Sequence, residues 1–433
     1  MSWFEKQFKL KEHNTDVRTE ILAGITTFMT MAYIIFVNPG ILSKTGMPFG
    51  SVLVATCLGA AIGSVLMAFL ANYPFALAPG MGLNAFFTFT VVMGMGVSWE
   101  TALAAVFVEG LIFIVLTVTK LREQVVNSLP KNLKIGVSAG IGFFITFIGL
   151  QNSGIIVNND AVLVGLTNLK TNLPALISFL GLFIMVYLEH KKVHGGILIG
   201  VVVITIISVL AGIAKVPDGI VSMPPSIAPI FCKMDFSSIA QGSFWVIVFT
   251  FFFVDFFDTV GTLVGVSSRA NMLDEKGALP NATGALMADA VGTVAGAALG
   301  TSTVTTFVES ASGVEQGGRT GLTALTVAVL FLVAMFFNPV ISIVPACATA
   351  PALIMVGCYM MMGFKDMVFD DWTEFFPALV AFFMMPMAYS IAAGIEFGTL
   401  SYVLLKAATG KGKEVHWIMY LLAVLFILNR AFM

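Results

Sequence analysis

Charged side chains are scarce in this sequence. Asp, Glu, Lys and Arg make up 11% of its 433 residues, whereas soluble domains contain about 25%. Hydrophobic residues account for 58% of the chain, and its mean hydropathy is +0.96. So few charges cannot cover the surface of a water-soluble protein of this length. We therefore predict an integral membrane protein whose helices face lipid.

The sequence also lacks the motifs of a nucleic-acid-binding protein, a metalloprotein or an enzyme. Its formal net charge is −2, and no run of Lys and Arg forms a basic patch. The four cysteines have no metal-ligand spacing, so we expect buried thiols and no metal site. No Ser/His/Asp set or phosphate loop is present, and the four histidines lie at loops or span ends. We expect neither an enzyme nor a cofactor, apart from a coupling proton.

Apolar residues form fifteen segments, most of them close to the length that a membrane-crossing helix needs, about 20 residues. The first stretch, from Ile21, leads directly into further spans, so we expect a retained helix and not a cleaved signal peptide. The segments are 20–43, 51–71, 76–96, 99–119, 134–150, 174–188, 195–213, 243–267, 284–300, 301–314, 320–338, 344–363, 374–389, 391–408 and 415–432.

Basic residues predict the orientation of these spans, because cytoplasmic loops are enriched in Lys and Arg. Turns 94–98 and 338–343, which would lie outside if the N-terminus were cytoplasmic, contain no Lys or Arg. The loops that would then lie inside carry Lys120, Arg122, Lys131, Lys134, Lys191, Lys192, Arg269 and Lys276. We predict a multi-pass protein of the plasma (inner) membrane with a cytoplasmic N-terminus.

The C-terminal part of the chain allows two interpretations. Segments 374–389 and 391–408 are either separate spans or one helix kinked at Pro386. Separate spans place Lys406 and Lys411 on the cytoplasmic side, so we predict fourteen spans. Residues 415–432 then remain as a short extra span or an interfacial helix.

The order of segments repeats along the chain. Ala55, Gly59 and Gly63 have small-xxx-small spacing in the second segment, and Ala288, Gly292 and Gly296 have it in the ninth. Such spacing lets helices approach closely in lipid. We predict two homologous halves near 20–213 and 243–432. Because each half has seven spans, the second is inverted relative to the first, as in secondary transporters.

An interrupted segment follows each of these helices. Pro79, Gly80 and Gly82 make a continuous third helix unfavourable. In the tenth segment Thr301, Thr303 and Thr305 alternate with other residues, which predicts a short extended piece. Irregular backbone is not tolerated in contact with lipid, so both stretches should be buried or line a wet cavity, each leading into a half-helix. The alternative is a pair of ordinary loops.

Six carboxylates lie within apolar segments, where a charge is costly. Asp255 and Asp258 are three residues apart, so both should lie on one face of the eighth span. A buried acid that alternately binds and releases a proton meets the chemical requirement of proton coupling. The alternative is a structural ion pair or a neutral, hydrogen-bonded acid. The six are Glu109, Asp255, Asp258, Asp289, Glu309 and Glu396.

The interrupted segments also carry candidate ligand-binding side chains. Glu309 lies where the tenth segment changes from extended to helical, so it can accept hydrogen bonds from a ligand. Asn84 in the third segment offers both a donor and an acceptor. Phe86 and Phe87 follow it, and an aromatic residue near a polar anchor suits a flat ligand with a polar edge.

Four stretches of the sequence resemble the AzgA-like branch of the nucleobase–cation symporters, the hypoxanthine/guanine/adenine permeases. These stretches are NTDVRTEILAGITTF (14–28), APGMGLNAFF (78–87), FVDFFDTVGTL (253–263) and VESASGVEQGGRTG (308–321). The resemblance implies an all-α polytopic fold of two inverted seven-span repeats, with spans 3 and 10 each made of a short strand and a half-helix. It implies a cytoplasmic segment 1–19, a core domain of 20–119 and 243–338, and a gate domain of 134–213 and 344–433.

The resemblance also implies roles for individual residues. Glu309 would bind the N–H edge of a purine, and Asp255 and Asp258 would share substrate contact and proton coupling. Asn84, Phe86, Phe87 and Thr305 would complete the substrate site, and Gly80, Gly82 and Gly261 would shape the backbone around it. Other branches have a Glu where this chain has Asp258, which leaves direct base contact by this shorter side chain open.

The favoured function is therefore proton-coupled import of purine nucleobases by alternating access in the lipid bilayer. Two alternatives remain: a uracil or xanthine permease of the same superfamily, and an anion carrier of similar fold. An anion site would favour cations or bare helix N-termini over clustered carboxylates. The preferred purine, proton or sodium coupling, and the oligomeric state, with a homodimer as one alternative, stay open.

Overall fold

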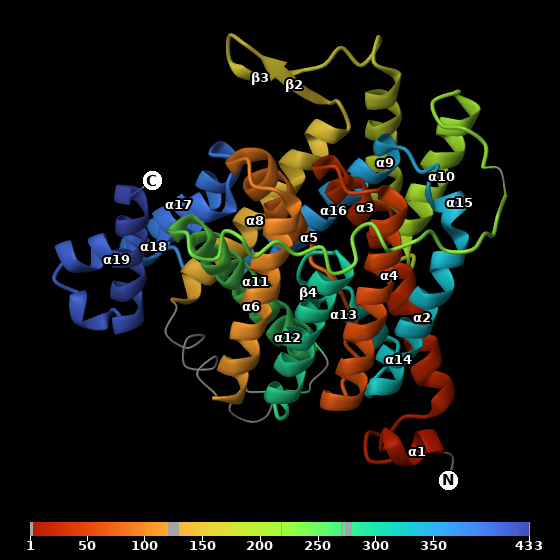
Figure 1. Cartoon of the computed structure of the whole chain (residues 1–433), viewed down its shortest axis with the longest axis horizontal. Helices are drawn as coiled ribbons and strands as arrows, with labels where there is room; N and C mark the ends of the chain where they lie inside the picture. Colours follow the sequence, from red (N-terminus) through yellow and green to blue (C-terminus); the bar gives the residue numbers. More distant parts are fainter. Residues whose placement is uncertain (1–2, 120–129, 218, 270–271, 273–278, 433) are drawn as a thin grey trace.

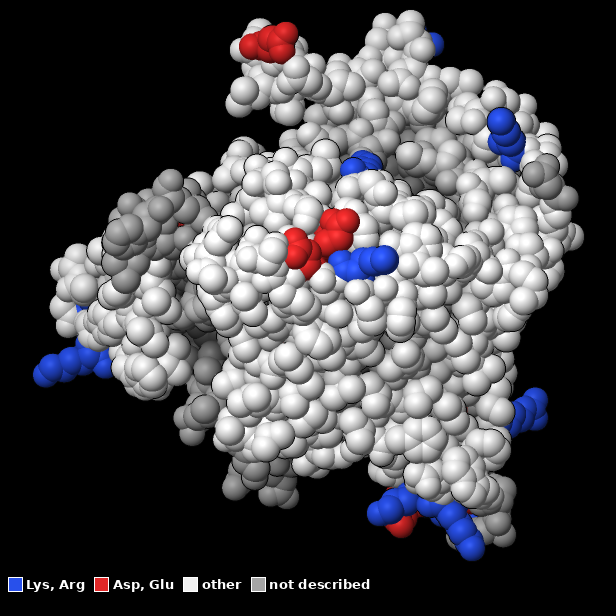
Figure 2. All heavy atoms as spheres, viewed as in Figure 1, with Lys and Arg blue, Asp and Glu red and all other residues white. Residues whose placement is uncertain are grey.

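Long helices lie side by side in the computed structural model of the chain (Figure 1). The structure describes residues 3–119, 130–217, 219–269, 272 and 279–432. Within these ranges, nine helices are long and apolar enough to cross a membrane, and five shorter apolar helices accompany them. Figure 2 shows wide areas of one face without charged side chains, as expected for a surface in contact with lipid.

The first half of the chain contains most of its short strands. Its elements are α1 (Trp3–Gln7), α2 (Val17–Met31), α3 (Ile34–Leu42), the 3₁₀ turn η1 (Ser43–Thr45), α4 (Phe49–Leu66), the π-helical turn η2 (Met67–Ala71), β1 (Leu77–Pro79), α5 (Met81–Ala85), the π-helical segment η3 (Phe86–Gly94), α6 (Trp99–Val118), α8 (Lys131–Asn152), β2 (Ile156–Asn159), β3 (Leu163–Leu166), α9 (Leu173–His190) and α10 (Gly196–Leu210). Strands β2 and β3 form an antiparallel hairpin that projects from one end of the molecule.

The second half follows the same order. Its elements are α11 (Gly242–Arg269), α12 (Ala282–Leu299), β4 (Val304–Thr306), α13 (Ser310–Glu315), α14 (Gly321–Ala334), η4 (Met335–Phe337), α15 (Asn338–Ile341), α16 (Ala346–Met361), η5 (Met362–Asp366), α17 (Trp372–Met387), α18 (Ile391–Ala408), η6 (Gly412–Glu414) and α19 (Trp417–Phe432). In each half a long helix, a short strand and a short helix follow one another, so the predicted pair of repeats is confirmed.

The backbone between α17 and α18 shows that segments 374–389 and 391–408 are two separate helices. α17 ends at Met387 and α18 begins at Ile391, so Pro386 does not kink one continuous helix. Tyr389 between them has a left-handed backbone with φ of 52°. Residues 417–432 form the separate helix α19, which packs on α18.

The helices pack in two sets. In the first set, α12 packs on α4 and α6, and α14 packs on α2 and α4. In the second set, α16 packs on α8 and α9, and α17 packs on α8 and α18. The first set comes from the two stretches predicted to form one domain, and the second from the stretches predicted to form the other.

The two interrupted spans meet in an antiparallel strand pair. β1 and β4 pair with Ala78 opposite Thr305, and the pair is extended by a hydrogen bond from the Gly80 N–H to the Thr303 carbonyl at 3.0 Å. All six strand residues are buried. The predicted short strands are confirmed, and each supplies the backbone partners that lipid cannot offer.

The small residues of α4 and α12 explain how these strands fit between helices. A Cβ at Gly63 would lie 2.9 Å from side-chain atoms of both Leu77 and Val304. A Cβ at Gly296 would lie 2.7 Å from the Val304 side chain. The predicted small-xxx-small faces therefore let the strand pair approach the two helices.

The segment between the two halves crosses one end of the first helix set. Residues 211–241, apart from the undescribed residue 218, contain turns and extended backbone but no helix. The Ser226 carbonyl accepts a hydrogen bond from Ser51 at 2.8 Å, and the Cys232 N–H donates to the Ala298 carbonyl at 2.8 Å. Figure 1 shows this segment in light green across the front of the molecule.

Candidate functional site

A cavity of about 550 Å³ opens beside the paired strands. Both helix sets contribute to its walls. The first set supplies Thr30, Tyr33, Gly80, Met81, Gly82, Asp258, Thr262, Thr305, Thr306, Phe307, Val308, Glu309, Ala311, Ser312 and Glu315. The second set supplies Glu189, Lys192, Val193, His194, Gly195, Gly196, Ile197, Val356, Tyr359, Met360 and Met362. The cavity therefore lies where a displacement of one set against the other would change its shape.

Glu309 lies at the start of the half-helix α13 and faces this cavity. Its side chain makes no capping hydrogen bond to the helix. Instead its Oε1 accepts a hydrogen bond from the Tyr33 hydroxyl at 2.5 Å. This hydrogen bond holds the Glu309 side chain towards Tyr33.

Tyr33 is a site residue that the sequence analysis missed. It lies at the turn between α2 and α3, where the helix is interrupted after Met31. Its side chain is 1% exposed, and its ring belongs to the apolar core. A Tyr in an apolar span gives no signal of its own, because it also suits a core position.

Hydroxyl groups hold the backbone at Glu309. The Ser312 hydroxyl donates to the Glu309 carbonyl at 2.7 Å. The Thr30 hydroxyl of α2 lies 2.9 Å from the Ser312 hydroxyl, so α2 and α13 are joined beside the cavity. These contacts fix the start of the half-helix relative to α2.

Asp258 comes from α11 and reaches the strand ends. Its Oδ2 lies 3.4 Å from the position that a Cβ of Gly80 would take. It is within electrostatic range of the carboxylates of Glu309 and Asp289. Asp258 and Glu309 thus form a pair of acids at one wall, and Thr262 lies one helical turn from Asp258 on the same wall.

Asp255 points to a different place. It is fully buried outside the cavity lining, and the Thr259 hydroxyl lies 3.1 Å from its Oδ1. The same hydroxyl lies 3.1 Å from both carboxylate oxygens of Asp289 and 2.8 Å from the Thr305 hydroxyl. Residues three apart on a helix differ by about 60° in direction, which is enough to send Asp258 into the cavity and Asp255 behind the strands.

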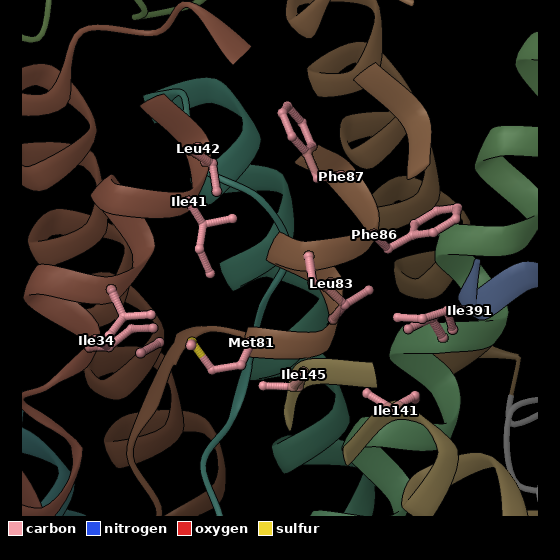
Figure 3. Close-up of a cluster of buried hydrophobic side chains, with 14 of the residues drawn as sticks. Ile34, Ile41, Leu42, Met81, Leu83, Phe86, Phe87, Ile141, Ile145 and Ile391 are labelled. Atoms are coloured by element: carbon pink, nitrogen blue, oxygen red, sulfur yellow. The ribbon is translucent and has the colours of Figure 1, made fainter. Parts of the chain in front are cut away.

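Three further residues expected at the substrate site also lie outside the cavity lining. Asn84 accepts a hydrogen bond from Ser302 and donates to the Pro79 carbonyl at 3.4 Å, so it joins the two interrupted spans. The ring of Phe86 packs edge-on against Phe251 at 4.8 Å, and Phe87 is buried on the same residue. Figure 3 shows both rings in the apolar cluster.

The predicted backbone-shaping glycines have separate surroundings. A Cβ at Gly80 would lie 2.6 Å from the Thr305 Cγ2, so β1 and β4 need Gly80 for their close approach. A Cβ at Gly82 would lie 2.7 Å from Ile141 of α8, where the two helix sets meet. Gly261 lies within α11, and its surroundings fall outside what the structure describes.

The opposite wall of the cavity comes from α16. Val356 and Met360 present apolar surface, and Tyr359 adds a hydroxyl that interacts with Glu189 at the end of α9. An apolar wall facing polar groups on the other side is typical of small-molecule sites, and the volume falls within their usual range of about 300–1,000 Å³.

The mouth of the cavity lies at the end of the molecule where α2 begins. Glu315 and His194 both line the cavity, and the His194 ring lies 2.9 Å from the Gln316 amide. A Cβ at Gly317 would lie 2.9 Å from Thr19 in the first turn of α2. The N-terminal segment is thus on the same side as the mouth.

The remaining buried acids lie outside the cavity lining. Glu109 of α6 is fully buried and lies 3.4 Å from the Thr303 hydroxyl, and Glu396 of α18 is buried in the second helix set. Glu20, which the sequence analysis missed, accepts hydrogen bonds from the Thr323 hydroxyl at 2.6 Å and the Arg319 N–H at 2.9 Å. Among the residues the structure describes, no group of three His, Cys, Asp or Glu could hold a metal ion.

A cavity between two helix sets, in a chain that crosses the membrane many times, is typical of membrane transport proteins. A family model described as "Permease family" matches residues 18–397. The chain therefore belongs to this family, that of the xanthine/uracil permeases.

Similar proteins indicate which branch of the permease family the chain resembles. The chain is 51% identical to the putative permease MJ0326 of Methanocaldococcus jannaschii, covering 99% of this chain and 98% of that one. It is 44% identical to the adenine permease AdeQ of Escherichia coli (98% and 95%) and 44% identical to the guanine/hypoxanthine permease PbuG of Bacillus subtilis (98% and 99%). These matches confirm the resemblance to the AzgA-like branch and support nucleobase transport.

A solved structure confirms the fold. The transmembrane domain of the cyanobacterial bicarbonate transporter BicA matches with a TM-score of 0.68, covering 87% of this chain and 97% of that one. The two sequences are 17% identical, so the likeness concerns the fold alone. The fold is the fourteen-span arrangement of two inverted repeats.

Proposed function

We propose that this permease imports purine nucleobases together with protons across the plasma membrane. The observation that carries the proposal is the pairing of Glu309 and Asp258 at one wall of a cavity between two helix sets. The names of the adenine and guanine/hypoxanthine permeases support purines as the substrate class.

The chemistry of the walls suits a flat base with a polar edge. Glu309 and Asp258 supply oxygen acceptors for the N–H donors of a purine. Val356 and Met360 on α16 supply apolar surface for its ring faces. A base without the matching donors would leave a buried acceptor unpaired, which costs affinity.

The lack of a cationic partner for these two acids among the described residues supports proton coupling. None of the ion pairs formed among the described residues includes Asp258 or Glu309. A carboxylate held inside a membrane protein without a cation is stabilised by a proton or by a ligand donor. Asp258 would therefore take up a proton with the base on one side and release it on the other.

Alternating access would use the two helix sets as core and gate domains. In this proposal 20–119 and 243–338 form the core, and 134–213 and 344–433 form the gate. With a cytoplasmic N-terminus, the mouth beside Gln316 faces the cytoplasm, so this conformation is open to the inside. At the other end, the Lys44 ammonium donates to Asn152 of α8 at 2.6 Å, and Phe89 packs on Tyr389.

Uptake by the purified protein in liposomes tests the proposal. We expect labelled hypoxanthine, guanine or adenine to accumulate when the outside is acidic, without a sodium requirement, and accumulation to end with an uncoupler. Glu309→Ala should abolish uptake, and Asp258→Asn should keep base exchange but lose accumulation. Glu315→Gln, at the mouth of the same cavity, is the matched control and should transport normally.

Two results would contradict the proposal. Uptake of uracil or xanthine in preference to the purines named above would indicate a different base specificity. Chloride- or bicarbonate-driven currents without any base uptake would indicate an anion carrier, which shares the fold of the bicarbonate transporter.

A further inference from the structure

We propose that Tyr33 determines which purine the cavity prefers. Its hydroxyl oxygen and the outer oxygen of Glu309 would form two neighbouring acceptors, which select a base that presents two neighbouring N–H donors. This inference rests on the proposed function, because it concerns the recognition of a base in the same cavity.

Tyr33 lies beside Glu309 in the cavity wall. Tyr33 and Glu309 both line the cavity, although they come from the first and the tenth spans. The Tyr33 ring is buried, and its hydroxyl donates a hydrogen bond to the Glu309 carboxylate of the tenth span. The two side chains therefore present their oxygen atoms side by side at one wall.

The hydrogen bond between Tyr33 and Glu309 determines what each side chain can offer to a ligand. A phenol has one hydrogen to donate and two lone pairs to accept. Tyr33 donates its hydrogen to Glu309 Oε1 at 2.5 Å, so toward a ligand it can only accept. In the ionised form that would bind the base, Glu309 Oε2 is also an acceptor, because a carboxylate has no hydrogen to donate.

The purine bases differ in how many neighbouring N–H donors they can present to this acceptor pair. The 2-amino-6-oxopurine guanine presents N1–H and the exocyclic amino group next to each other. Hypoxanthine lacks the amino group, and adenine places its amino group next to an acceptor nitrogen. The acceptor pair thus favours guanine over hypoxanthine by one hydrogen bond, about tenfold in affinity.

The cavity contains a matched control residue. Tyr359 of α16 lines the same cavity, but its hydroxyl interacts with Glu189 at the end of α9. Removal of that hydroxyl changes the opposite wall and leaves the Tyr33–Glu309 hydrogen bond in place. Tyr359→Phe therefore separates a specific role of Tyr33 from a general effect of a lost cavity hydroxyl.

Calorimetric binding of guanine, hypoxanthine and adenine to the purified full-length protein provides the test. We expect the wild type to bind guanine about tenfold more tightly than hypoxanthine. Tyr33→Phe should lower guanine affinity more than hypoxanthine affinity and bring their ratio close to one, whereas Tyr359→Phe should keep the wild-type ratio. An unchanged ratio in Tyr33→Phe, or no guanine preference in the wild type, would overturn the inference.

Modified bases supply a measurement that needs no variant. On the wild-type protein, a guanine with a dimethylated exocyclic amino group should bind no better than hypoxanthine. Equal binding of this analogue and guanine would contradict the acceptor pair. If the wild type binds none of these bases, the proposed function itself fails, which distinguishes the two failures.

Discussion

Ala78 lies opposite Thr305 in the antiparallel pair of β1 and β4, at the centre of the molecule. Thr305 lines the cavity, and its hydroxyl lies 2.8 Å from that of Thr259 behind the strands. This pair is one of three that join the two repeats, and its Thr305 side chain lies between the cavity and the Thr259 hydroxyl that contacts the buried acids Asp255 and Asp289. A change in strand spacing should therefore affect the cavity first.

Gly80→Ala tests the spacing of the strands. The new methyl group would lie 2.6 Å from Thr305 Cγ2, closer than atoms can approach, so β1 and β4 would have to separate beside Asp258. We expect base binding to weaken at least tenfold while the protein still folds. Gly40→Ala in α3, where a Cβ meets nothing within 4 Å, should bind as the wild type does. Normal binding by Gly80→Ala would show that the site tolerates a wider strand pair.

Glu20→Ala tests the join between α2 and α14. The carboxylate accepts hydrogen bonds from the Thr323 hydroxyl and from two backbone N–H groups at the start of α14. Its loss leaves buried donors unpaired, so the free energy of unfolding should fall by about 3 kcal/mol. Thermal unfolding in detergent measures this change. Glu12→Ala, which removes an exposed pair with Lys9, should leave the transition unchanged, and equal transitions for both variants would disprove this role.

Variants of Lys406 in α18 and of its two partners test how much the free energy of unfolding falls when a buried cation loses its ion pairs. Its side chain is 3% exposed and lies 2.8 Å from both Glu374 and Glu414, which are 28% and 58% exposed. Without Lys406 the two glutamates can still reach water, whereas Lys406 without them stays buried and unpaired. We expect Glu374→Gln/Glu414→Gln to lower the free energy of unfolding by about 3 kcal/mol, more than Lys406→Met does. The reverse order in unfolding measurements would exclude this explanation.

Cross-linking tests the contact at the closed end. Lys44 beside the end of α3 and Asn152 at the end of α8 are joined by a hydrogen bond, and the proposed alternating access would require them to separate. The exposed Cys232 and Cys358 are first changed to Ser. In that background, treatment of Lys44→Cys/Asn152→Cys with a short bifunctional thiol reagent that forms reducible cross-links should abolish uptake. A reducing agent should restore it, and Lys44→Cys alone should be unaffected. Full uptake after complete cross-linking would mean that these ends stay together during transport.

The interrupted spans could be predicted because their residues exclude the usual helix. Pro79 and Gly80 disfavour a continuous helix, and the alternating threonines from Thr301 favour extended backbone. Both signals are local, and the structure confirms both strands. The pairing of these strands with each other is not local, and the sequence analysis did not predict it.

The directions of side chains were harder to predict. The i,i+3 spacing placed Asp255 with Asp258, but a helix rotation of about 60° separates their surroundings. Asn84 had the chemistry of a ligand-binding residue, yet its hydrogen bonds go to Ser302 and Pro79. Tyr33 gave no signal because its role depends on Glu309, which joins it only in the folded protein.

The strand pair also sets an order for how the protein is made. β1 leaves the ribosome well before β4, so the backbone groups that pair with β4 have no native partner while the later helices are translated, although Ser64 of α4 already bonds the Leu77 backbone. No water is present in the hydrocarbon region to replace those partners. We therefore expect the third span to reach its native stability only when the second repeat has been made and packs against it.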